Sequence, residues 1–213
     1  MSIIIGINAF HADSSAAIFE NGKLLFAIEE EKLIRKKHWA GFPEYSIKKC
    51  LEYNSIDASA VTDISINSNP FSNLYMKVPY FLKKYIVGKK KKEIFERIKS
   101  KLDIKNYLIK NFNFNKNLKI HYIDHHIAHI ASSFYPSEFQ ESLAISIDGF
   151  GDFASLNIAK CNEKKITILK KIFFPDSLGI FYEMMTQLLG FQNYGDEYKL
   201  MGLTSYGKPI YFD

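Results

Sequence analysis

The sequence predicts an α/β fold built from two successive copies of a strand–strand–strand–helix unit. Short apolar runs bounded by turn residues begin at Ile3 and again at Leu143, and each is followed by a polar hairpin and two more strand-like runs. Helix-length amphipathic segments then follow each set of strands. This alternation of hairpin sheets and helices favours a mixed α/β domain.

The first copy begins with short apolar strands that are joined by polar turns. Asn21 and Gly22 separate two of these runs, and this pair of residues favours a two-residue hairpin. Pro43 can occupy the first turn of a helix, where its missing N–H has no helical partner. The predicted strands are residues 3–8, 15–19, 23–29, 61–67 and 118–123, and the predicted helices are residues 44–53, 80–112 and 125–134.

The second copy repeats this order with little sequence identity to the first. It predicts strands at residues 142–147, 154–159 and 165–174, a turn at residues 149–151, and a helix at residues 178–189. The predicted first lobe is residues 1–140, with a helical insertion near 80–113, and residues 141–213 begin a second lobe that is left truncated. The arrangement resembles the actin-like, sugar-kinase-like ATPases, in which the first hairpin of each lobe faces a cleft and handles phosphate.

Composition limits the classes of function. The 213 residues are 47% hydrophobic and 24% charged, as in an ordinary globular protein. The net charge of +5 suits anionic small molecules, whereas the lysines are mostly spread out and nucleic acid is not favoured. The cluster at residues 89–92 is interpreted as a solvated helix surface. Cys50 and Cys161 stand far apart, and no long apolar run is present, so a cytoplasmic protein without a membrane span is expected.

The most informative motif is a pair of histidines followed by a carboxylate. His125 and His129 are four residues apart in a predicted helix, so both imidazoles can share one face. Asp148 ends a predicted strand, and Gly149 follows it without a side chain. Two imidazoles and a carboxylate can form a facial metal site with open positions for substrate. Satisfied or surface histidines are the alternative interpretation.

Two polar loops of the first unit are candidates for binding phosphate. Residues 6–16 contain His11 and Ser14, and they are either plain turn formers or a loop whose N–H groups and hydroxyls meet phosphate, with His11 as hydrogen-bond donor or acid. Arg35 and Lys37 precede an aromatic, glycine-containing loop, where cations would suit carboxylate or phosphate binding. A solvated charged helix start is the alternative for this second segment.

A third candidate region follows the last predicted helix. Gly195 begins a stretch that is either a helix N-cap or, with Lys199 and Gly202, a contact to nucleotide. Asp152 is as compatible with a turn-stabilising role as with a functional one.

Taken together, the motifs resemble successive blocks of the O-carbamoyltransferases of nodulation-factor and antibiotic biosynthesis. The family shares its amino-terminal fold with the ATPase that forms threonylcarbamoyladenosine on tRNA and with the hydrogenase-maturation carbamoyl transferases. The resemblance runs from residue 3 to about 209 and is concentrated in residues 11–16, 29–43, 125–134, 148–152, 177–182 and 194–202.

This resemblance implies a metal-assisted chemistry in two steps. Carbamoyl phosphate and ATP would give a carbamoyl-adenylate, and the carbamoyl group would then pass to a hydroxyl of a small-molecule or sugar acceptor. A divalent metal, usually assigned as iron, would be held by His125, His129 and Asp148, while His126 is a bystander. His11 would lie near the phosphates, Lys37 near the carbamoyl group with Lys36 as the competing alignment, and Gly149 and Gly151 would face nucleotide.

The resemblance also implies that more polypeptide is needed. Family members are considerably longer, because they carry a second ATPase lobe with a further aspartate ligand and a separate domain that makes carbamoyl-adenylate. We therefore expect an amino-terminal part of an O-carbamoyltransferase that needs a polypeptide supplying the missing lobe. The alternatives are a catalytically incomplete nucleotide- or metal-binding module or remnant that needs a partner polypeptide, and, more weakly, a tRNA-modifying ATPase.

Overall fold

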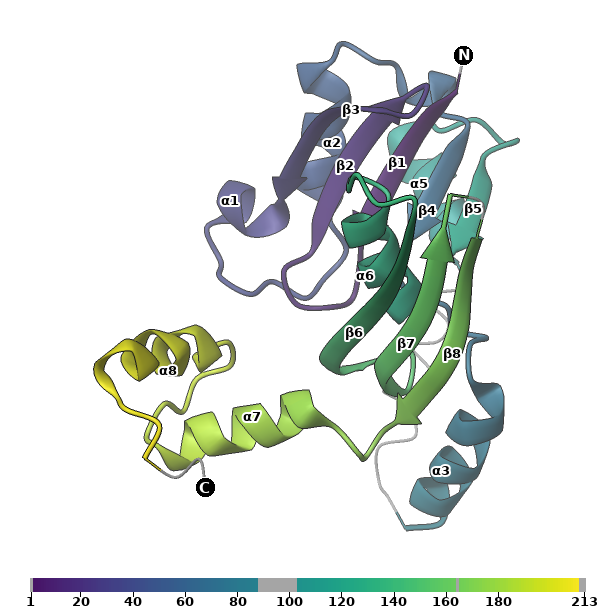
Figure 1. The fold of residues 1–213 in the computed structure, drawn as a ribbon. Helices are drawn as coiled ribbons and strands as arrows, with labels where there is room; N and C mark the ends of the chain where they lie inside the picture. Colours follow the sequence, from purple (N-terminus) through teal and green to yellow (C-terminus); the bar gives the residue numbers. More distant parts are fainter. Residues whose placement is uncertain (1, 88–102, 164, 211–213) are drawn as a thin grey trace. The chain divides into compact units, whose positions relative to one another are not determined.

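The computed structural model describes residues 2–87, 103–163 and 165–210. It forms two compact units, Met1–Ala128 and His129–Asp213, and the boundary between them falls inside helix α6 (His125–Phe134). Figure 1 shows the order of the elements along the chain. Within the described residues, no helix is both long and apolar enough to cross a bilayer.

The first unit is built on a five-stranded mixed sheet with the order β3-β2-β1-β4-β5. Its central strand, β1, pairs antiparallel with β2 and parallel with β4, while β5 runs parallel to β4. Asn21 and Gly22 join β2 to β3 with φ values of 48° and 83°, as a type I′ hairpin requires. The strands are β1 (Ile3–Asn8), β2 (Ser15–Glu20), β3 (Lys23–Glu29), β4 (Asp63–Ile66) and β5 (Lys119–Tyr122).

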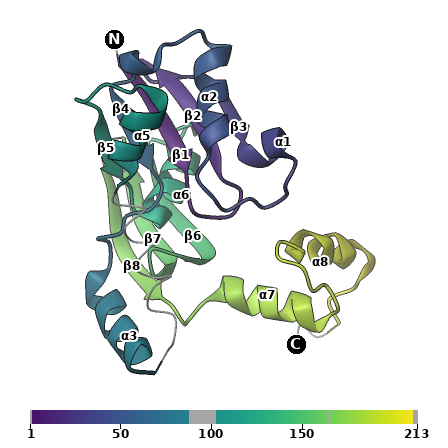
Figure 2. The ribbon, with the colours of Figure 1, turned by 180° about the vertical axis from the view of Figure 1, so that it is seen from behind.

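Helices α2 and α5 cover one face of this sheet (Figure 2). Alternate residues of β1, such as Ile5, face Ile47 of α2 and Leu108 of α5 in a core where all three side chains are fully buried. The helical elements are α1 (Glu30–Ile34), α2 (Glu44–Tyr53), the 3-10 turn η1 (Ala58–Ala60), α3 (Leu74–Val87) and α5 (Ile104–Phe112). The helix predicted at residues 44–53 is confirmed.

The helical insertion differs from its prediction in its first boundary. The helix expected from residue 80 begins at Leu74, and Pro79 lies inside it although proline disfavours a helix interior. The end of the insertion, Phe112, agrees with the prediction. The lysine cluster at residues 89–92 lies outside the described residues.

The second unit contains a three-stranded antiparallel sheet in the order β6-β7-β8. Ile130 and Phe134 of α6 pack against Ala159 and Cys161 of this sheet. Two helices follow, and Figure 1 shows α7 extending away from the end of β8. The elements are β6 (Glu141–Gly151), β7 (Ala154–Asn162), β8 (Lys165–Phe173), α7 (Leu178–Leu188), α8 (Glu197–Leu203) and η2 (Thr204–Tyr206).

The turn predicted at residues 149–151 is wrong. Strand β6 continues through Gly151, and the reversal occurs at Asp152 and Phe153, which have φ values of 49° and 73°. The pairing of β6 with β7 shifts register between Ile147 and Gly151. Glycine in a strand often marks such an irregularity, and the sequence pattern could not distinguish it from a turn.

Both units therefore contain an antiparallel three-strand meander that is followed by helices. In the first unit, the meander continues into the parallel pair β1–β4, which gives the mixed order 3-2-1-4-5. The predicted mixed α/β architecture is confirmed, with β1 and β6 as the corresponding first strands.

Candidate metal centre

Helix α6 carries both histidines, and Asp124 fixes where this helix begins. One carboxylate oxygen of Asp124 accepts the backbone N–H of His126 at 3.2 Å, and the other accepts the hydroxyl of Ser72 at 2.6 Å. The carbonyl of Asp124 accepts the N–H of Ala128 at 2.9 Å, which is the first helical bond. Aspartate is a preferred N-cap because it satisfies N–H groups that have no partner inside the helix. By fixing the start of α6, Asp124 determines the direction in which His125 and His129 project from the helix.

Asp148 is held near the end of β6 by the start of α7. The Ser177 hydroxyl lies 2.6 Å from the Gly149 carbonyl oxygen and 3.1 Å from the Asp148 carbonyl oxygen, and it also accepts the N–H of Ile180 at 3.1 Å. A Cβ added to Gly179 would come within 2.5 Å of the Asp148 carbonyl carbon. Glycine is therefore required at position 179, and the first turn of α7 supports the backbone that carries the carboxylate.

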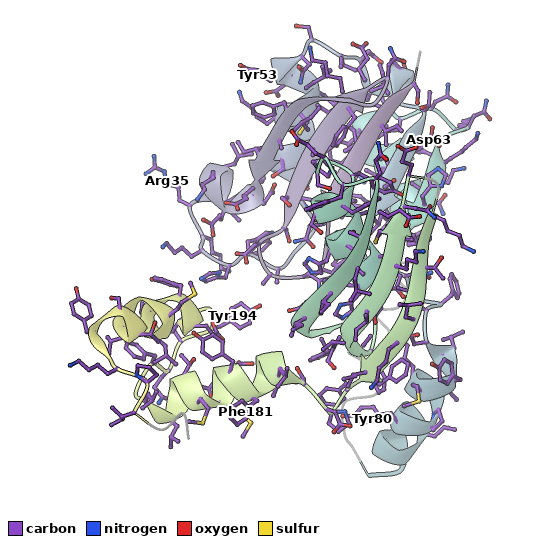
Figure 3. The ribbon with its side chains drawn as sticks, in the orientation of Figure 1. Arg35, Tyr53, Asp63, Tyr80, Phe181 and Tyr194 are labelled. Carbon is purple, nitrogen blue, oxygen red and sulfur yellow. The ribbon has the colours of Figure 1, made fainter. Side chains whose placement is uncertain are left out.

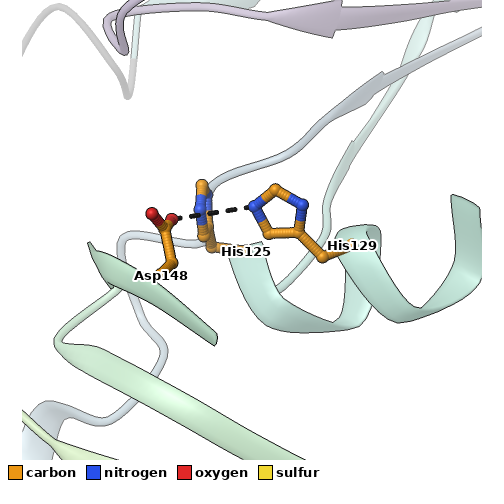
Figure 4. Close-up of side chains that lie close together, drawn as sticks. All are labelled: His125, His129 and Asp148. Carbon is orange, nitrogen blue, oxygen red and sulfur yellow. Dashed lines mark ion pairs between the residues drawn. The ribbon is translucent and has the colours of Figure 1, made fainter. Parts of the chain in front are cut away.

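The three predicted ligands converge (Figure 4). Nε2 of His129 lies 3.7 Å from Oδ2 of Asp148, whose Oδ1 accepts the N–H of Gly149 at 2.6 Å. His125 precedes His129 by one turn of α6, and one ligand atom from each of the three residues lies within 4.8 Å of the other two. Two ligands of one ion are at most about 4.2 Å apart, because each bond is about 2.1 Å long. The donor set and spacing therefore fit a metal site after small side-chain adjustments.

The three candidate ligands differ in exposure. His125 is buried, whereas the side chains of His129 and Asp148 are 53% and 38% exposed. An ion held by these groups would have protein on one side and open positions on the other, as a substrate-binding metal requires.

His126 is fully buried, and its ring meets that of His125 edge-on at 5.6 Å. The family resemblance implies that His126 is a bystander, so its replacement should change metal binding little. Its burial makes it a poor control, because replacing a fully buried side chain leaves a cavity and destabilises the fold. His121, which is half exposed and 2.7 Å from Asp63, is a better comparison.

His11 lies next to the metal candidate. Its ring stacks on that of His125 within the first unit, with centroids 5.1 Å apart and planes inclined by 29°. The loop that carries His11 is tied down by Asn8, whose amide donates to the carbonyls of Ala12 and Asp13 at 3.0 Å each. The hairpin loop and the histidine helix thus meet at His11 and His125.

Ser14, predicted to contact nucleotide, is fully buried. Its hydroxyl lies 2.7 Å from the carbonyl oxygen of Gly41 and 3.1 Å from that of His11. This hydroxyl joins two loops of the first unit.

The cations predicted near the reacting group differ in their surroundings. Arg35 ends α1 in a left-handed conformation and extends into solvent (Figure 3). Lys37 is also exposed. Lys36, the competing alignment, places its ammonium 4.7 Å from the centre of the Trp39 ring. This cation–π contact engages Lys36 within its own loop.

The second-unit residues predicted to face nucleotide lie in β6, just before α8, and within α8. Gly149 and Gly151 lie in β6, and a Cβ at Gly149 would meet nothing within 4 Å. Gly195 has a φ of 82° and precedes α8. Lys199 lies 2.6 Å from Asp196, and this hydrogen bond holds the pKa of the Asp196 carboxyl below its usual value. Asp196 occupies the N-cap position of α8 without a side-chain capping bond.

The fold and the ligand cluster define a mixed α/β protein with two imidazoles and a carboxylate that could hold a metal ion. Comparison with protein families identifies the group within that class. Residues 3–211 match the family described as "Carbamoyltransferase N-terminus", and the chain belongs to this family.

Curated relatives are about one third identical to this chain over the aligned residues. An uncharacterized protein of Synechocystis sp. is 34% identical over 226 residues, which cover 100% of this chain and 36% of the relative. Nodulation protein NolNO of Sinorhizobium fredii is 33% identical over 204 residues, which cover 95% of this chain and 29% of that protein. The chain therefore spans about a third of the length of these relatives.

Solved structures show weaker likeness. YeaZ from Pseudomonas aeruginosa has a TM-score of 0.44 at 12% identity, covering 82% of this chain and 68% of YeaZ. A Ppx/GppA phosphatase of Aquifex aeolicus has a TM-score of 0.38 at 11% identity, covering 98% of this chain and 65% of that chain.

Proposed function

We propose that this chain supplies the metal and phosphate site of an O-carbamoyltransferase. The reaction would move a carbamoyl group from carbamoyl phosphate, through a carbamoyl-adenylate formed with ATP, to the hydroxyl of a small molecule or sugar. The observation that carries the proposal is the convergence of His125, His129 and Asp148 in a member of the carbamoyltransferase family. One relative is named as a nodulation protein, in line with the resemblance of the sequence to carbamoyltransferases of nodulation-factor biosynthesis.

The ligand set suits a divalent cation such as Fe(II). Two imidazoles and one carboxylate with open positions are typical of non-haem iron. When bound, such an ion would offset the negative charge that accumulates between carbamoyl phosphate, ATP and the leaving groups. The ligands would be held in place by their neighbours. Asp124 fixes the start of α6, which carries the two histidines, and Ser177 and Gly179 contact the backbone that carries Asp148.

The remaining predicted residues would bind and orient the reactants. His11, beside His125, would donate a hydrogen bond to phosphate or take the proton that leaves the acceptor hydroxyl. Lys37 and Arg35 are cations that could reach an anionic substrate, because both side chains are exposed. The nucleotide-facing set would be Ser14, Gly149, Gly151, Gly195 and Lys199.

In the transfer step, the acceptor oxygen would attack the carbamoyl carbon of the adenylate. The bond from that carbon to the adenylate oxygen would break, and AMP would leave with the electron pair. A hydroxyl is a weak nucleophile until its proton is removed. A neutral imidazole such as His11 would accept that proton.

We further propose that the rest of a family member completes this site, either within one polypeptide or as a partner chain. In this view, residues 1–140 form the first ATPase-like lobe, and residues 141–213 begin the second. Apolar side chains of the second unit are extensively exposed, including Phe181 of α7 (Figure 3). Those of β6 and α7 that are more than half exposed are Leu143, Ile145, Ile147, Phe150, Leu178, Phe181, Met184 and Leu188. Exposed apolar surface of this kind marks a protein contact.

The test is to incubate the chain with carbamoyl phosphate, ATP and Fe(II), with and without a polypeptide that supplies the remainder of a family member. We expect pyrophosphate and carbamoylated acceptor only in the complete mixture. Binding of metal and ATP without turnover in the complete mixture would instead favour a non-catalytic binding module. Turnover by the 213-residue chain alone would refute the need for further polypeptide.

A further inference from the structure

Two loops of the first unit are joined by backbone hydrogen bonds. The hairpin loop, residues 9–14, carries His11, and the cationic loop, residues 35–41, carries Lys37. The N–H of Phe10 donates to the carbonyl of Gly41 at 3.0 Å, and the N–H of Ser14 donates to the carbonyl of Trp39 at 2.9 Å. These bonds hold the base of the cationic loop and leave its tip to be fixed by other contacts.

A side-chain pair fixes the tip. Nδ1 of His38 lies 3.0 Å from Oδ1 of Asp13, although the two residues are 25 positions apart. The backbone N–H of His38 donates to Oε2 of Glu31 at 3.1 Å. His38 is thus held at its ring by the hairpin loop and at its backbone by α1.

Both partners of this pair have left-handed backbones. The φ values are 58° at Asp13 and 53° at His38, and Phe10 and Arg35 in the same two loops have φ values of 62° and 56°. Non-glycine residues adopt this region at an energetic cost, and such residues gather where the surrounding structure imposes the conformation. The side-chain bond between Asp13 and His38 is a contact that can impose it on both loops.

Asp13, Glu31 and His38 also meet the distance criterion for holding an ion, since their ligand atoms lie within 4.8 Å of one another. The hydrogen bonding favours a clamp instead. Oε1 of Glu31 accepts Lys32 Nζ at 2.9 Å, and Oε2 accepts the N–H of His38. Both oxygens of the Glu31 carboxylate therefore already accept hydrogen bonds from neighbouring groups, which disfavours their use as metal ligands.

We propose that Asp13 and His38 are positioning residues that lock the cationic loop onto the hairpin loop. His38 adjoins Lys37, and Asp13 is two residues from His11, so one contact aligns the two candidate reactive side chains. Their participation in carbamoyl transfer rests on the proposed function, whereas the clamp itself does not. The side chains of Asp13 and His38 are 51% and 38% exposed, so their contact orders the loops locally while adding little to the stability of the whole fold.

Trp39 provides a local reporter because it is the only tryptophan in the chain. Its indole packs against Gly41, where an added Cβ would come within 2.6 Å of the ring. The Lys36 ammonium also makes a cation–π contact with this ring. Loosening of the cationic loop should therefore expose Trp39 to a soluble quencher.

The experiment measures acrylamide quenching of Trp39 in wild type, Asp13→Ala, His38→Ala, Asp13→Asn and His38→Asn. Asparagine tolerates left-handed backbone and can keep a hydrogen bond across the pair, so it is the matched control at each position. In the alanine variants, we expect the population of open loop to rise about two- to fivefold with an unchanged melting temperature, as for loss of an exposed pair. The asparagine variants should lie near wild type. Equal quenching in all five proteins would overturn the clamp.

Carbamoyl transfer in the complete mixture then tests positioning. We expect the alanine variants to lower kcat and leave the KM for ATP unchanged, with recovery in the asparagine variants. Unchanged kcat in variants with loosened loops would overturn the positioning role. An inactive wild-type mixture would count against the proposed function, and the quenching comparison would still decide for or against the clamp.

Discussion

Replacing Gly179 by alanine tests how strictly α7 supports Asp148. The added methyl would lie 2.5 Å from the Asp148 carbonyl carbon and the Gly149 nitrogen, and 2.6 Å from the Asp148 carbonyl oxygen. All three are backbone atoms, so no rotation of a side chain can relieve the contact. Alanine in a helix normally stabilises by about 0.5–1 kcal/mol relative to glycine. Overpacking costs about 1–3 kcal/mol, so the net effect at this site should be destabilising.

The metal site should respond as well. The backbone of Asp148 must shift by several tenths of an ångström, whereas metal–ligand distances tolerate about 0.2 Å. Loss of a supporting contact weakens metal affinity by about 10- to 100-fold. The assays are urea unfolding and titration with Co(II) under reducing conditions.

Gly202→Ala is the matched control, because it also lies in a helix and an added Cβ meets nothing within 4 Å. We expect this control to be neutral or slightly stabilising, with unchanged metal affinity. If Gly179→Ala behaves like Gly202→Ala in both assays, the proposed support of Asp148 by α7 is refuted.

Two further outcomes follow from the structure. Asp124→Ala should lower the free energy of unfolding by about 1 kcal/mol through loss of the α6 cap, whereas Asp124→Asn should retain most of the capping energy. Chemical denaturation measures the stability of both variants, and equal losses would contradict the capping role. Burial raises the pKa of the Cys50 thiol from 9.0 to about 11. Because the folded state disfavours the thiolate, this contribution to stability is complete below about pH 9 and declines as pH rises towards 11. Alkylation of Cys50, followed by mass spectrometry, should be slow in folded protein and fast in urea; rapid labelling of folded protein would contradict its burial.

Local sequence patterns were sufficient for the parts of the site that lie on one element. The spacing of His125 and His129 predicted a shared helix face, and helix α6 has the predicted bounds. Asn21 and Gly22 predicted a hairpin for the same reason, because the turn geometry depends on those two residues. The turn predicted at residues 149–151 failed because glycine fits both a turn and an irregular strand.

Contacts between distant segments could not be predicted from such patterns. Asp13 and His38 are 25 positions apart, and Ser177 and Gly179 reach Asp148 across 29 and 31 positions. The Ser177–Tyr182 segment stood out as a motif, yet only the tertiary structure assigns it to the support of Asp148. Asp124 was recognisable in principle, since an aspartate just before a helix is a common N-cap.

Equilibrium dialysis against Fe(II), without oxygen, tests the central claim most directly. The wild-type chain should bind about one equivalent of metal, because one ligand atom from each of three residues lies within 4.8 Å of the other two. His129→Ala should lose this binding, since it removes an imidazole that lies 3.7 Å from Asp148. His121→Ala, which removes a half-exposed histidine paired with Asp63, should bind like wild type. Equal binding by the wild type and both variants, or no binding by any of them, would contradict a metal centre formed by α6 and β6.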